Sequence, residues 1–133
     1  MAAGYFSART TIQIYLAIKL FPFRQNNTAA LLAMLYLRNN PNPTIPVIVK
    51  SFGTAPLHGT TRRYLENTVN VPVNTFTGVG FGAAACNGLN IQEYQIAIPT
   101  NLLFNGAPGG VPNNVPANFN IDLFMLQDVF LNK

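Results

Sequence analysis

The four acidic residues are the first place to look for catalysis, because paired carboxylates carry out much acid–base chemistry. They are Glu66, Glu93, Asp122 and Asp128. On an extended strand, the six steps from Asp122 to Asp128 separate the two carboxyl groups by about 20 Å. A glycosidase pair needs roughly 5 to 10 Å. Glu66 and Glu93 lie in separate segments and would meet only by an accident of strand pairing. The spacing therefore predicts no catalytic carboxylate pair.

One histidine and one cysteine remain as candidates for a base and a nucleophile. His58 lies in the Gly53–Thr60 segment, where we expect a surface loop. Nothing in the sequence around Cys86 is typical of an activated thiol, and we expect a small buried side chain. Zinc and calcium need clusters of ligands that this chain lacks. The glycines of Gly78–Gly82 lack the lysine and the strand–loop–helix context of a phosphate-binding loop. We therefore predict no enzymatic activity, no cofactor and no metal.

Scarcity of charge is the strongest feature of the composition. Of 133 residues, 9% are charged, and the formal net charge is +4. An ordinary soluble domain has roughly 25% charged residues. Uncharged polar and turn-forming residues take their place, with 17 Asn, 10 Gly and 10 Pro. This composition excludes disorder driven by high net charge, a coiled coil, and a basic nucleic-acid-binding arm. A single cysteine also excludes an internal disulfide framework.

The length predicts one domain, residues 1–133. The most apolar region, Ile12–Leu37, is interrupted by Lys19, Pro22 and Arg24, whereas a spanning helix needs about 20 largely uninterrupted apolar residues. We therefore expect no membrane segment, and Gln13 and Lys19 argue against a signal peptide.

Apolar residues recur mainly with a period of two, which predicts strands. The first strand lies within Thr10–Phe23 and ends in a turn at Arg24–Asn27. Thr28–Arg38 follows, and we favour a strand that completes a hairpin. Its helix-favouring composition leaves a short helix near 28–38 as the alternative. A third strand, Ile45–Lys50, contains Pro46, which indicates a sheet edge.

The second half of the chain shows three more alternating segments. They are Arg63–Val73, Ile91–Ile98 and a closing strand, Phe119–Leu131. The last is apolar on both faces in its middle. Pro99–Ala117 is a long irregular stretch. Together the segments predict an all-β, single-domain antiparallel β-sandwich, jelly-roll-like.

Strands with uncharged outer faces would leave edges that natural proteins usually guard with charge. Burial of these surfaces by neighbouring subunits resolves the conflict, because interfaces are poor in charge and rich in aromatic residues. We expect a homo-oligomer, a trimer or a pentamer. The candidate interface combines a basic–aromatic cluster, the long loop and the outer face of the closing strand. Its residues are Arg62, Arg63, Tyr64, Asn105, Pro108, Pro112, Asn113, Phe124 and Phe130.

The closing segment reads Val115-Pro116-Ala117-Asn118-Phe119-Asn120-Ile121-Asp122-Leu123-Phe124. With the order of strands and turns before it, it resembles the small virion proteins of bacteriophages, either single jelly-roll penton proteins or decoration (cement) proteins. The resemblance implies a jelly roll, a role in the virion, contacts with other subunits and with a larger capsid protein, and no enzymatic activity.

Two other functions stay open. A shell-forming coat protein would contact nucleic acid through Arg62 and Arg63, although the dispersed basic residues make this partner unexpected. A glycan-binding β-sandwich would use Tyr64, Tyr94 and the Pro99–Ala117 loop. The size of the protein in solution separates these alternatives from an assembly subunit.

Overall fold

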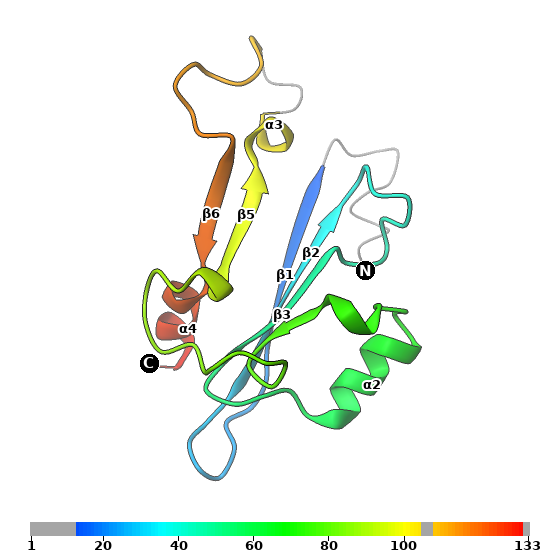
Figure 1. Cartoon of the computed structure of the whole chain (residues 1–133), viewed down its shortest axis with the longest axis vertical. Helices are drawn as coiled ribbons and strands as arrows, with labels where there is room; N and C mark the ends of the chain where they lie inside the picture. The colour runs from blue at the N-terminus through cyan, green and yellow to red at the C-terminus, as the bar shows by residue number, and fades with distance from the viewer. Residues whose placement is uncertain (1–12, 105–107, 132–133) are drawn as a thin grey trace.

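The computed structural model describes residues 13–104 and 108–131, and these form two sheets and three α-helices (Figure 1). The four-stranded sheet has the order β1-β2-β3-β4 and a two-stranded sheet contains β5 and β6. The strands are β1 Ile14–Leu20, β2 Ala30–Leu37, β3 Ile48–Gly53, β4 Phe76–Gly78, β5 Gln95–Pro99 and β6 Asn118–Asp122. The helices are α2 Gly59–Asn67, α3 Thr100–Leu103 and α4 Leu123–Leu131, with single 3₁₀ turns at Val73–Thr75 and Gln92–Tyr94.

The predicted hairpin at the start of the chain is confirmed. β1 and β2 pair antiparallel, from Ile14 opposite Leu37 to Leu20 opposite Leu31. The turn closes where the Arg24 N–H donates to the Thr28 carbonyl at 2.7 Å. Asn27 adopts a φ of 63°, a left-handed conformation that asparagine tolerates better than most residues.

The Thr28–Arg38 segment, for which the sequence allowed either a strand or a helix, forms strand β2. β2 is buried on both faces, which accounts for its continuous apolar run. The residues on its two faces belong to two different hydrophobic clusters. Such a strand loses the period of two that usually identifies strands, so its composition resembles that of a buried helix.

The third strand begins later than predicted and lies in the middle of the sheet. β3 pairs antiparallel with β2 and parallel with β4. Pro46 comes before the strand, so it removes no hydrogen bond from either ladder. The parallel pair requires a crossover, which α2 supplies. At Gly78, φ is +101° and an added Cβ would lie 1.9 Å from the Ser51 carbonyl oxygen, so only glycine allows this close approach.

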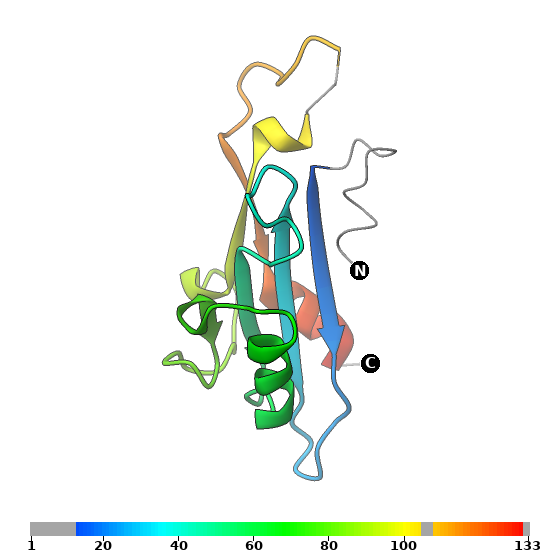
Figure 2. The same cartoon turned by 90° about the vertical axis from the view of Figure 1, so that its right-hand side faces the viewer.

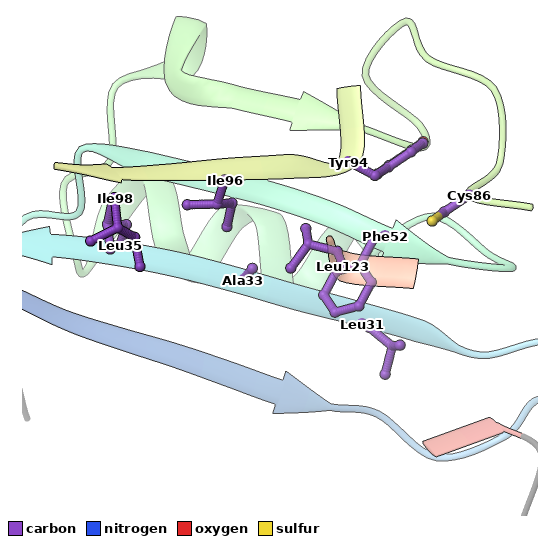
Figure 3. Packing of buried hydrophobic residues seen from close by; sticks show 9 residues of the cluster. All are labelled: Leu31, Ala33, Leu35, Phe52, Cys86, Tyr94, Ile96, Ile98 and Leu123. Atoms are coloured by element: carbon purple, nitrogen blue, oxygen red, sulfur yellow. The ribbon is translucent and has the colours of Figure 1, made fainter. Parts of the chain in front are cut away.

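The larger hydrophobic cluster lies between the two sheets (Figure 3). β2 and β3 contribute one face, β5 the other, and the first residue of α4 closes one end. Its buried members are Leu31, Ala33, Leu35, Phe52, Cys86, Tyr94, Ile96, Ile98 and Leu123. Tyr94, Ile96 and Ile98 alternate along the predicted Ile91–Ile98 segment and are all buried here, and facing sheets are the part of the sandwich prediction that the structure bears out.

The smaller cluster lies on the opposite face of the four-stranded sheet, under α2. Leu32 and Val49 from the sheet contact Leu65 of the helix, and Val71 and Phe76 complete it. The layers are therefore α2, the four-stranded sheet, and the β5–β6 hairpin with α4 (Figures 1 and 2).

Two predicted strands are helical over part of their length, so the fold is mixed α/β. The predicted Arg63–Val73 strand is wrong, because its first residues, 63–67, belong to helix α2. An ion pair from Arg62 to Glu66, one helical turn apart, stabilises this helix. The closing strand ends at Asp122, where α4 begins. The Asp122 carboxylate accepts a hydrogen bond from the Phe124 N–H at 3.1 Å, which satisfies one of the free donors at the helix start.

Candidate functional site

Arg62, the first residue of the predicted basic cluster, is tied into its own domain. Its Nε lies 3.2 Å from Glu66 Oε1. Its guanidinium carbon lies 4.9 Å from the centre of the Phe81 ring and 5.9 Å from that of Phe76. Phe81 and Phe76 stack on one another, with centroids 5.2 Å apart. Arg62 therefore joins α2 to the β4 region, and this role competes with contacts to a phosphate backbone.

Arg63 and Tyr64, the next two residues, are exposed on α2. The Tyr64 ring is 58% exposed and lines a groove of about 660 Å³ between α2 and the β1–β2 hairpin. From the sheet, the floor includes Ala17, Lys19 and Tyr36.

Most side chains that line this groove are uncharged. Lys19 is the one charged residue among the lining side chains, and no acid or histidine joins it. The Lys19 ammonium lies 5.9 Å from the Phe21 ring centre. The Tyr36 hydroxyl donates to the Met34 sulfur at 3.8 Å, and burial raises the pKa of Tyr36 above its ordinary value. A neutral phenol, a thioether and an ammonium supply no general base for catalysis at ordinary pH.

The predicted interface loop projects from one end of the molecule (Figure 1). Pro108, Pro112 and Asn113 are exposed in it, and Asn105 lies outside the described residues. Thr100 anchors the base of the loop, since its N–H donates to the Ala117 carbonyl at 2.9 Å and its hydroxyl donates to the Pro116 carbonyl. These two hydrogen bonds therefore hold the two ends of the loop together. In the sequence, the loop is far from the groove under α2.

The predicted interface residues of the closing segment are only partly exposed, because the segment is a helix. Phe124 packs against the larger hydrophobic cluster, and Phe130 is half-buried. Met125 and Val129, one helical turn apart, take the outer face instead and are 62% and 56% exposed. A helical reading of the same sequence would have found this pair at positions i and i+4.

Exposed apolar side chains are not confined to α4. Others stand at 39% exposure or more in β1, β6, α3 and the turns and loops. They are Leu20, Phe23, Val73, Leu89, Leu103, Val111 and Phe119. Scattered apolar residues are normal on a protein surface. The pair on α4 differs because two adjacent large side chains share one face of a helix.

Cys86 and His58, the candidate nucleophile and base, lie in different environments, one buried and the other exposed. Burial, followed by the Asp122 carboxylate, raises the pKa of the Cys86 thiol from 9.0 to about 11. His58 is exposed just before α2. Asp122 and Asp128 are closer than a strand would place them, about 9 Å along a helical path. However, Asp122 accepts hydrogen bonds from the N–H groups of Asn90 and Phe124.

Neither a cluster of metal ligands nor a helix fit to cross a membrane occurs in residues 13–104 and 108–131. Within them, no three histidine, cysteine or acidic side chains gather as a metal site. No helix in this part of the chain has the length and apolar character needed to cross a membrane. Tyr94, proposed for a glycan site, is 1% exposed and donates to the Ala84 carbonyl, so it cannot stack on a sugar.

No protein-family model matches the sequence, and neither a curated protein nor a solved structure matches it.

Proposed function

We propose that this chain is a non-enzymatic structural subunit of a virus particle, of the penton or decoration type, that acts through contacts with other subunits. The observation that carries the proposal is the outer face of α4, where Met125 and Val129 stand more than half exposed. Burying large apolar side chains stabilises an interface by about 25 cal/mol per Å² removed from water. A free monomer would leave this face in water.

The low content of charged residues supports the same role. Interfaces are depleted in charged residues, and only 9% of this sequence is charged. Two of the charges pair across the fold, since Lys50 Nζ lies 3.7 Å from Glu93 Oε1 and also donates to the Glu93 carbonyl. The resemblance to small phage virion proteins suggests the particle, and two facing sheets are compatible with a jelly-roll ancestry.

Self-association is the property to measure. We expect the purified protein to form oligomers in sedimentation velocity runs between about 1 and 200 µM. The double variant Met125→Lys/Val129→Lys should lower the average mass, because charge on an apolar contact face is costly to bury. Gln25→Lys/Asn67→Lys adds the same charge to exposed polar positions outside α4 and is the matched control.

The particle itself is tested by fractionation. In a lysate of its natural source, the chain should sediment with nuclease-resistant particles in a density gradient. A chain that stays monomeric at 200 µM and remains at the top of the gradient would contradict the proposal. Binding of the monomer to a glycan array would then favour the module with a ligand groove beside Tyr64.

A further inference from the structure

The outer edge of β1 is the longest unpaired strand edge in the described part of the chain. β1 has seven residues and is the first strand in the order of its sheet, whereas β4 at the other end has three (Figure 2). Lys19 is its one charged residue, and no proline or bulge interrupts it. Natural proteins usually protect such an edge, because its free N–H and C=O groups can pair with another strand.

The hydrogen bonds at the two ends of the strand show which residues point their backbone groups outward. The Arg38 N–H donates to the Gln13 carbonyl at 2.9 Å, and the Phe21 N–H donates to the Ala30 carbonyl at 3.3 Å. Odd-numbered residues of β1 therefore bond to β2. In an antiparallel ladder the alternate residues face the other way. The outward N–H and C=O groups belong to Ile14, Leu16, Ile18 and Leu20.

We propose that two copies of this chain pair antiparallel through their β1 edges, about a two-fold axis that passes through Ala17. This inference deepens the proposed function and rests on it, since it names one contact of the assembly. Centred on Ala17, Ile14 lies opposite Leu20 of the second copy, and Leu16 lies opposite Ile18. All the outward groups are then paired. A register shifted by two residues in either direction places Leu20 or Ile14 opposite a residue outside β1.

The side chains of β1 fit the same register. Tyr15 falls opposite Lys19 of the second copy, which places an ammonium beside an aromatic ring. The two Lys19 side chains are about 13 Å apart along the strands, so the like charges do not face one another. Ala17, on the axis, meets its own copy with the smallest side chain of the strand. Cα atoms in such a non-hydrogen-bonded pair lie about 4.5 Å apart.

The pairing also uses surface that the monomer leaves half-covered. Ile14, Leu16 and Ile18 touch the larger hydrophobic cluster and are only partly buried. A strand placed beside them continues the sheet and covers their outer sides. On the opposite face, Ala17 and Lys19 line the groove under α2. The grooves of the two copies therefore adjoin across the axis.

Disulfide trapping tests the contact and its register. In an Ala17→Cys variant the two new cysteines should form an intermolecular disulfide under mild oxidation, because the Cα separation lies within the range a disulfide accepts. Lys19→Cys is the matched control, on the same strand and the same face, and should not cross-link with itself. A mixture of Tyr15→Cys and Lys19→Cys proteins should cross-link. The wild-type chain, whose Cys86 is 1% exposed, should give no dimer.

A second pair of variants replaces covalent trapping with charge. Ala17→Glu and Ala17→Lys should each lose the two-fold contact, and an equimolar mixture should regain it as a heterodimer. Circular dichroism spectra that match the wild type show that each variant is folded. No cross-link in Ala17→Cys, or equal cross-linking in Lys19→Cys, would overturn the pairing. If oligomers persist while the cross-link is absent, the proposed function stands and this contact is wrong.

Discussion

The side chain of Gln127 joins three separate parts of the fold, and its replacement by methionine tests how much that junction stabilises the protein. Gln127 is 4% exposed. Its Oε1 accepts a hydrogen bond from the Gly53 N–H at 2.9 Å, and its Nε2 donates to the Cys86 carbonyl at 2.7 Å. α4 is thereby fastened to the end of β3 and to the loop before β5. Methionine has nearly the same length and no strong hydrogen-bonding group.

Gln127→Met leaves one buried donor and one buried acceptor without partners. Each such group costs about 1 to 3 kcal/mol, and the added apolar surface offsets part of this cost. We expect the free energy of unfolding to fall by about 2 to 4 kcal/mol, out of roughly 5 to 15 kcal/mol for a whole domain. With a urea slope of roughly 2 kcal/mol per molar, the midpoint should fall by about 1 to 2 M.

Urea unfolding followed by circular dichroism measures this change. The matched control is Gln25→Met, the same substitution at an exposed turn position, where we expect a change within about 0.5 kcal/mol. A Gln127→Met midpoint equal to that of the control would refute the reasoning. It would mean that the two backbone groups find other partners without cost.

Two further predictions concern the β3–β4 contact and the buried thiol. Gly78→Ala should lower the free energy of unfolding by about 2 kcal/mol or more, as overpacking of a buried site does. The reason is that the added Cβ would overlap the Ser51 carbonyl oxygen. Gly82→Ala has a similar φ of +96° but open space around it, so urea melts of the two variants separate overlap from backbone strain, and equal losses would rule out the overlap. The urea midpoint should also fall between pH 9 and pH 11, because the unfolded chain loses the Cys86 proton near pH 9 while the folded chain holds it to about 11. Cys86→Ala should show a smaller fall over the same interval, and an unchanged slope would contradict this assignment.

Local patterning was enough to predict the elements with one buried face. The alternation in β1 and the turn at Arg24–Asn27 predicted the first hairpin, and the alternation in Ile91–Ile98 predicted the strand that contains β5. These predictions succeed because a period of two, closed by turn residues, depends on little beyond the neighbouring residues.

The candidate site was less accessible to sequence reasoning. Tyr64 was singled out and does line a groove, but that groove exists only because α2 crosses over β1 and β2. Arg62, a candidate interface residue, also makes contacts within its own domain that the sequence pattern did not reveal. The exposed pair Met125 and Val129 was missed, since their spacing has meaning only on a helix.

The sequence by itself determined the low charge and the strong strand signals of β1 and β5. The tertiary structure decided the states of α2 and α4, whose apolar residues suit either a strand or a helix. Asp122 shows the reason. Its carboxylate begins α4 while also accepting the N–H of Asn90, 32 residues earlier in the chain, and no window of local sequence contains both contacts. The place of β1 as the first strand of its sheet among the described residues likewise follows from the order of strands, which is a property of the folded chain.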